Sequence, residues 1–208
     1  MFSKFKKRGE TLVEVITAIT VIAIAGTASV SVIISTFRTT AISQEYLVAQ
    51  NLAREAMESV INKRDTNWLK YPSNKGECWL RITDPEPAAA ENCLTEDADE
   101  IFAKDNYYYI LRDFEDGDGE LSISKTINGI DLLNEEGLEI GLNLDTDENL
   151  YVSADPDEAK WFREVYIDEV DEDTPLSEKV KVNVKVQWRG VHKLGTYEAS
   201  TILTNYAN

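Results

Sequence analysis

The chain has 208 residues, which is enough for one folded domain and a long appended segment. Its 38 acidic residues outnumber its 21 basic residues and leave a net charge of −17. Direct binding to a phosphate backbone requires a basic surface, so we expect no direct nucleic-acid partner. The sequence has one histidine and contains no nucleophile elbow, phosphate loop or zinc motif, so we do not expect an enzyme.

The N-terminus combines a basic segment with a long apolar run. Basic residues precede Gly9, and the apolar run then extends from Leu12 to Phe37, longer than the roughly 20 residues that span a bilayer. Basic residues ahead of the run keep the N-terminus in the cytoplasm, which predicts a single-pass inner or cytoplasmic membrane protein with its C-terminal part outside. One acid, Glu14, lies within the run. A carboxylate at the centre of a membrane helix costs about 2.5–3.5 kcal/mol and usually has a function.

The pattern predicts that this helix continues beyond the apolar run. Apolar residues recur at three- and four-residue spacing from Ile42 to Ile61, and no Pro or Gly occurs between Thr27 and Trp68. A cleaved secretory signal with a site at Ala23–Ala25 and a simple signal anchor are the competing interpretations, and neither accounts for Glu14. The predicted helix covers residues 10–64, divided into a membrane and assembly segment (10–37) and an amphipathic half (38–64).

Residues 65–208 are predicted to form an external globular α+β domain. Valines alternate with polar residues from Val180 to Trp188, which indicates a strand with one buried face, and Tyr197–Thr204 is its predicted partner. Tyr107–Leu111 and Trp161–Asp168 are further predicted strands. The predicted fold class is therefore α+β, with a long N-terminal helix packed on a C-terminal antiparallel sheet.

The only two cysteines, Cys78 and Cys93, lie in the predicted external part and enclose 14 residues. An even pair in an oxidising compartment favours one disulfide bond. Metal ligation is the alternative, but no further cysteine or nearby histidine completes a site.

Two acidic segments carry oxygen donors at alternate positions, as calcium loops do. One is 116–120, and the other contains Asp145, Asp147 and Asn149. Neither segment has the complete spacing of an EF-hand loop. Calcium binding, for which the second segment is the better candidate, and simple solvation of acidic turns are both open interpretations.

The segment Lys6–Ile19 (KKRGETLVEVITAI) resembles the prepilin leader and assembly segment of type IV pilins and pseudopilins. The segments Ala49–Glu55 and Arg64–Trp68 are similar to the end of the long helix in pilin-like proteins of Gram-positive and small-genome bacteria. Trp161–Arg163 and the strand ending at Trp188 are also similar to that group.

This resemblance implies a processing and assembly pathway for the chain. Residues 1–9 would be the leader, removed after Gly9 by prepilin peptidase, and Glu10 would become an N-methylated N-terminus. The family usually has Phe at the position of Glu10. Glu14 would pair with the N-terminal amine of a neighbouring subunit, because a buried carboxylate is tolerated when a buried cation compensates it.

The function implied by the resemblance is that of a structural subunit of a type IV pilus-like filament. Its partners would be copies of itself or other pilins, the prepilin peptidase, the membrane and the pilus assembly platform. The chain would reside in the membrane before assembly and in a cell-surface filament afterwards. A pseudopilin of a secretion or DNA-uptake machine and a non-polymerising membrane-anchored binding domain are the alternatives.

Overall fold

A computed structural model describes residues 10–82, 102, 106–113, 120–126, 129–132, 134, 141–145, 150–168, 178–190 and 193–205. The elements are α1 (Glu10–Lys70), α2 (Lys75–Cys78), β1 (Tyr107–Asp113), β2 (Glu120–Thr126), β3 (Gly141–Asp145), β4 (Leu150–Ala154), β5 (Trp161–Asp168), β6 (Lys179–Arg189) and β7 (Leu194–Thr204). The chain divides into two compact units, residues 1–45 and 46–208. The α+β class, with one long N-terminal helix packed against an antiparallel sheet, is confirmed.

The helix α1 ends at Lys70, beyond the helix end at residue 64 that the sequence predicted. The additional turn contains Asn67, whose buried side-chain amide donates to the carbonyl oxygens of Trp79 at 3.2 Å and Arg81 at 2.8 Å. These bonds hold the last helical turn against the segment that follows it. Pro72 then follows, and its fixed ring and missing N–H prevent the helix from continuing.

The part of α1 within the second unit contributes one face to the core. Its buried apolar side chains are Ala49, Leu52, Ala53, Ala56 and Val60. Three of these five are alanines, which allow the helix backbone to approach the sheet closely. The positions of Ala49, Ala53 and Val60 agree with the three- and four-residue spacing in the sequence, because this spacing places side chains on one helix face.

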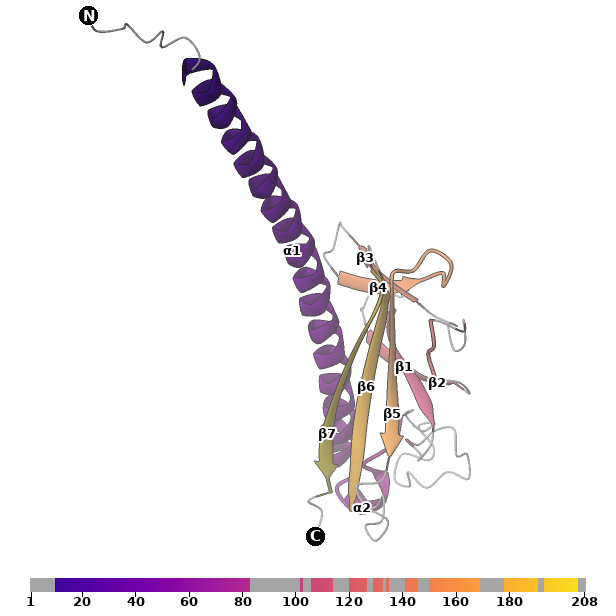
Figure 1. Ribbon diagram of the computed structural model, residues 1–208. Coiled ribbons are helices and arrows are strands. Elements are labelled where there is room, and N and C mark those ends of the chain that lie inside the picture. Colours follow the sequence, from indigo (N-terminus) through magenta and orange to yellow (C-terminus); the bar gives the residue numbers. More distant parts are fainter. Residues whose placement is uncertain are drawn as a thin grey trace, which may run out of the picture. The chain divides into compact units, whose positions relative to one another are not determined.

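The sheet is built around β5, and every strand pair in it is antiparallel (Figure 1). Strand β6 lies between β5 and β7, while β1 and β3 pair with β5 and continue to β2 and β4 respectively. All four predicted strands are present, within β1, β5, β6 and β7. The short elements β2, β3, β4 and α2 were not predicted.

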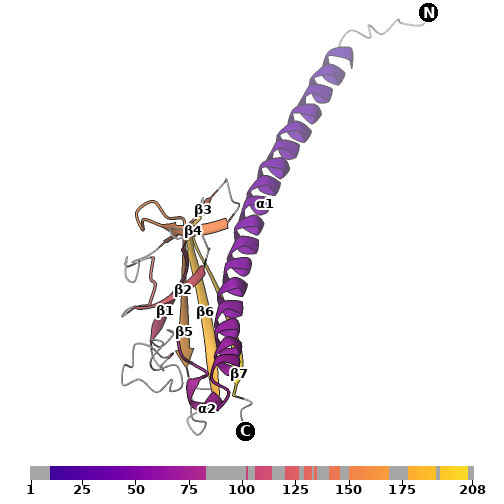
Figure 2. The same ribbon diagram turned by 180° about the vertical axis from the view of Figure 1, so that it is seen from behind.

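The sheet has two differently covered faces. On the inner face, the alternate residues of β6 from Val180 to Trp188 are buried in one cluster with the core residues of α1, and the part of α1 within the second unit runs along this sheet (Figure 2). On the outer face, Tyr109 and Phe162 are buried in a second cluster with Ile130 and Leu132. The connection between β2 and β3 therefore supplies a cover for the outer face.

Candidate functional site

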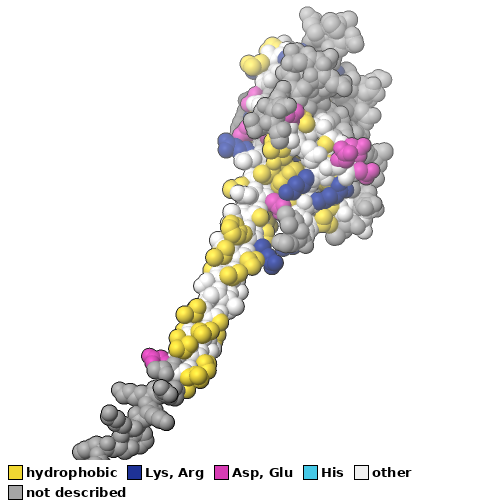
Figure 3. Space-filling view, turned by 90° about the horizontal axis from the view of Figure 1, so that it is seen from above, with side chains coloured by type: hydrophobic (Ala, Val, Ile, Leu, Met, Phe, Trp, Pro, Cys, Tyr) yellow, Lys and Arg dark blue, Asp and Glu magenta, His cyan; other side chains and the backbone are white. Residues whose placement is uncertain are grey.

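The first part of α1 is an apolar helix whose side chains are exposed. The residues from Leu12 to Phe37 are exposed throughout, and Figure 3 shows hydrophobic side chains along this stretch on the face in view. Ile22 and Phe37 are 70% and 71% exposed. Within α1 there is a stretch that is long and apolar enough to cross a membrane, and none of it is buried inside the protein. A surface of this kind requires an apolar environment such as lipid or neighbouring helices.

The hydroxyl groups in this helix are bonded to its own backbone. Six of the seven Ser and Thr side chains between Leu12 and Phe37 donate to carbonyl oxygens three or four residues earlier, at 2.8–3.0 Å. Examples are Thr20 to Ile16 and Ser29 to Ala25. A hydroxyl group satisfied in this way presents no unpaired donor to the surroundings, so the polar residues of the stretch remain compatible with lipid.

Glu14 is the one charged residue between Leu12 and Phe37, and its side chain is exposed on the helix. Its carbonyl oxygen accepts a hydrogen bond from Thr17 Oγ1 at 2.9 Å. Among the described residues, no side chain donates to its carboxylate. A carboxylate in an apolar helix that has no donor among the described residues is suited to a cation from another molecule.

The other residues of the predicted processing site are only partly described. Glu10 is the first residue of α1, whereas Gly9 lies outside the described residues. Cleavage after Gly9 and methylation of Glu10 stay predictions.

The predicted cysteine pair is likewise described at one of its two positions. Cys78 ends α2 and is buried with Tyr71 in a small cluster. Within the described part of the chain there is no free cysteine. Cys93 lies outside the described residues, so its pairing with Cys78 stays a prediction.

The preferred calcium segment joins β3 to β4. Asp145 is the last residue of β3, and Leu150 is the first residue of β4. Asp147 and Asn149 lie outside the described residues, as do residues 116–119 of the other acidic segment. In the part that is described, no three or more His, Cys, Asp or Glu side chains are grouped to hold a metal ion.

The sequence interpretation missed an arginine that connects α1 to the sheet. Arg163 Nη1 donates to Glu55 Oε2 at 2.8 Å and to the carbonyl oxygen of Leu52 at 3.0 Å, while Nη2 donates to the carbonyl oxygen of Ile110 at 2.6 Å. The Arg163 side chain is 3% exposed. The available signal was the position of Arg163 two residues before Val165 in a strand, because residues two apart lie on the same face, here the inner one.

Together these features place an unburied apolar helical segment and a folded domain on the same helix, α1. Comparisons with known proteins found no matching family model, curated protein or solved structure.

Proposed function

We propose that this protein is a structural subunit of a type IV pilus-like filament, processed after Gly9, anchored by the first part of α1 and polymerised through it. The main support is the composition of α1. An exposed apolar segment with a single carboxylate continues without interruption into the core helix of a folded domain. A cleaved signal peptide has no need to share a helix with the core of the mature protein.

Assembly would depend on compensation of the Glu14 charge. In the membrane, the carboxylate is costly because lipid provides no hydrogen-bond donors. In a filament, the N-terminal amine that cleavage creates at Glu10 of one subunit would meet Glu14 of its neighbour. The ion pair forms only in one axial register, so it would select the correct arrangement of subunits.

The first test is the intact mass of the mature protein, purified from the membrane of a cell that contains a prepilin peptidase. The proposal expects the loss of residues 1–9 and a new N-terminus at Glu10. Cleavage near Ala25 would identify a secreted protein, and an intact leader would identify a simple membrane anchor. Either of those results would refute the processing step.

The second test compares Glu14→Gln and Glu14→Leu with Thr17→Val, a control one turn away on the same helix. Membrane insertion and the amount of protein in sheared surface filaments are measured for each. We expect both Glu14 variants to insert as well as the wild type and to be lost from filaments, whereas the Thr17 variant assembles normally. Glu14→Leu is informative because it makes the segment more apolar, so its failure to assemble cannot result from poor insertion.

A non-polymerising, membrane-anchored extracellular domain is the alternative function. It shares the exposed apolar segment but assigns no role to Glu14. This alternative would be favoured over the filament subunit by two results together. The domain would reach the cell surface without filaments, and Glu14→Gln would reach it in the same amount as the wild type.

A further inference from the structure

Strand β7 is the last strand on its side of the sheet. It pairs with β6 along all eleven of its residues, and among the described residues no strand or backbone group bonds to its other edge (Figure 1). In an antiparallel pair, every second residue turns its N–H and C=O away from the partner strand. The free edge of β7 therefore presents a row of backbone donors and acceptors to which a further strand can bind.

The packing of the inner face leaves this edge open. The inward side chains of β6, from Val180 to Trp188, are at most 2% exposed. The inward side chains of β7 are only half-buried at Tyr197, Ala199 and Thr201. The cover of the inner face thus extends over β6 completely and over β7 only in part.

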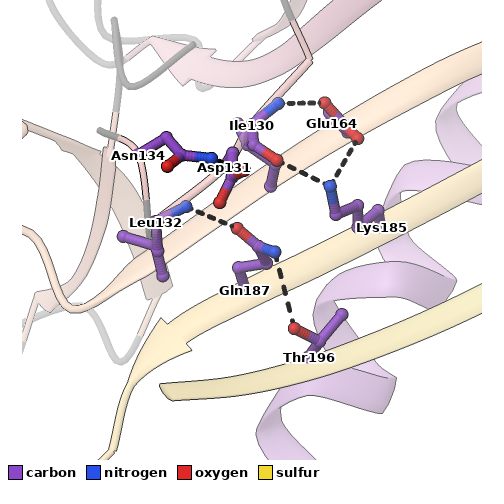
Figure 4. Close-up of polar contacts among 8 residues, drawn as sticks. All are labelled: Ile130, Asp131, Leu132, Asn134, Glu164, Lys185, Gln187 and Thr196. Carbon is purple, nitrogen blue, oxygen red and sulfur yellow. Dashed lines mark hydrogen bonds and ion pairs between the residues drawn. The ribbon is translucent and has the colours of Figure 1, made fainter. Parts of the chain in front are cut away.

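The described cover of the outer face leaves β7 open as well. Figure 4 shows residues 130–132 held over β5 and β6 by the side chains of Glu164, Lys185 and Gln187. Toward β7, Gln187 Nε2 donates to Thr196 Oγ1 at 3.5 Å, and Thr196 is nevertheless exposed. A partner strand at this edge would therefore meet exposed side chains on the outer face of β7.

Strand β7 also lacks the features that usually protect a long edge strand. Lysines, prolines, bulges and short length are the common protection. The sequence LGTYEASTILT has neither lysine nor proline, Glu198 is its one charged residue, and its register on β6 contains no bulge. The other two described edge strands are shorter, since β2 has seven residues, among them Glu120 and Lys125, and β4 has five. Of these three edges, β7 is the best suited to a partner strand.

The sequence of β7 is complementary to itself. When two copies pair antiparallel over their full length, Ala199 faces Ala199, and residues at equal distances on either side of it face each other. Glu198 then faces Ser200, so no like charges lie directly opposite, and Tyr197 faces Thr201, a favourable aromatic and β-branched pair. Full-length pairing supplies about ten backbone hydrogen bonds, the number in a typical protein–protein interface.

We propose that β7 is a self-association edge, at which a second copy of this chain adds its own β7 in an antiparallel register centred on Ala199. The contact is isologous, so it joins two copies and is then complete. The inference concerns the second unit of the chain and does not rest on the filament function.

The direction of α1 determines which copies can meet in this way. Within the second unit, Tyr46 packs on Trp188 with ring centroids 5.3 Å apart, and Trp188 pairs with Gly195 near the start of β7. At the other end of β7, the Asn205 side chain donates to the carbonyl oxygen of Gly76, shortly after α1, at 3.1 Å. This part of α1 and β7 therefore run in the same direction. Two copies paired through β7 have these helical parts in opposite directions, which suits chains that approach from opposite sides rather than parallel neighbours in one filament.

Cysteine cross-linking of the full chain in detergent micelles tests the register. Ala199→Cys places two cysteines opposite each other with Cα atoms about 4.5–5.5 Å apart, within the range of a disulfide bond. Thr201→Cys is the matched control on the same face, because its two copies would lie about 13 Å apart along the strands. The wild type is oxidised in parallel, since the chain has two cysteines of its own.

We expect a disulfide-linked dimer for Ala199→Cys and none beyond the wild-type level for Thr201→Cys. Equal cross-linking of the two variants would show contact without this register and would overturn the proposal. Absence of cross-linking in both variants would overturn it as well.

Charge substitutions on the outer face test the same register without cysteines. Sedimentation equilibrium in micelles at about 0.15 M salt, which screens the repulsion between acidic copies, gives the Kd of the dimer. Ser200→Lys forms two cross-strand pairs with Glu198 and should lower this Kd about 2- to 30-fold, whereas Ser200→Glu should raise it by a similar factor. Thr196→Lys has the same net charge as Ser200→Lys but faces Ile202 of the copy, so it should lower the Kd less. Equal Kd values for Ser200→Lys and Thr196→Lys, or a full chain that stays monomeric, would contradict the proposal.

A repeat of both measurements in Glu14→Gln separates this proposal from the filament function. The filament proposal expects Glu14→Gln not to polymerise, whereas pairing through β7 should be unchanged in it. Loss of the dimer in Glu14→Gln would assign the association to the first part of α1. That result would overturn pairing through β7 and leave the filament function intact.

Discussion

In the Glu55–Arg163 ion pair, Arg163 is buried more deeply than Glu55. Removal of Glu55 and removal of Arg163 should therefore lower the stability of the domain by different amounts. The Arg163 side chain is 3% exposed and that of Glu55 is 30% exposed. Glu55→Ala leaves a buried guanidinium without its counter-charge but with two carbonyl acceptors. Loss of one partner of a buried ion pair typically costs 3–5 kcal/mol, and the remaining acceptors reduce this to an expected cost of about 3 kcal/mol.

Removal of the Arg163 guanidinium group should lower the free energy of unfolding less than removal of Glu55. Arg163→Met leaves Glu55, which is partly hydrated, and the methionine fills much of the volume. We expect a loss of about 1–2 kcal/mol from the hydrogen bonds. The double variant should then be close to Arg163→Met alone, which corresponds to a coupling energy of about 3 kcal/mol between the two positions.

Urea unfolding of the full chain in detergent micelles measures these differences. Tryptophan fluorescence reports the core, since Trp161 and Trp188 are 4% and 2% exposed. Glu58→Ala is the matched control on α1, because its ion pair with Arg54 is exposed and should contribute less than about 0.5 kcal/mol. If Glu55→Ala costs less than Arg163→Met, the explanation by an uncompensated buried charge is incorrect.

Two further substitutions test local packing by the same assay. Gly195→Ala places a Cβ atom 2.1 Å from Trp188 Cε2 and should destabilise the domain by about 1–3 kcal/mol, whereas Gly26→Ala meets no atom within 4 Å and should leave the urea midpoint unchanged. Asn67→Ala removes both side-chain hydrogen bonds at the end of α1 and should cost about 1–3 kcal/mol, while the exposed Asn51→Ala should change stability by less than about 0.5 kcal/mol. If Gly195→Ala changed stability no more than Gly26→Ala, the close contact with Trp188 would be contradicted. If Asn67→Ala changed stability no more than Asn51→Ala, the hydrogen bonds of Asn67 would be contradicted.

The sequence was most informative where one face of an element is buried along its whole length. The alternation from Val180 to Trp188 predicted β6 because its register on β5 and β7 keeps every second residue in the core. The helical spacing likewise predicted the core face of α1. Short strands such as β3 and β4 have five residues each, too few to establish a period, and acidic residues between them favoured a loop.

The sequence was least informative where distant residues complete each other's hydrogen bonds. Nothing near Glu164 indicates that its partner is the N–H of Ile130, 34 positions earlier, and Leu132 is bonded by a side chain 55 positions later. The end of α1 was missed for a similar reason, because Asn67 finds its acceptors 12 and 14 positions away. Glu14 could be selected as a candidate functional residue because a lone acid in an apolar run is visible without knowledge of any partner.

The core of the domain is formed by residues that are far apart in the sequence, and this determines when folding can be completed. Ala49 and Val60 of α1 belong to the same cluster as Leu203, which is near the end of the chain. During synthesis, the core face of α1 emerges well before β5, β6 and β7 and has no sheet to cover it. Contacts between such distant positions slow folding, as for Leu52 and Arg163, which are 111 positions apart. The newly made chain should therefore be most prone to aggregation in the interval before β7 pairs with β6.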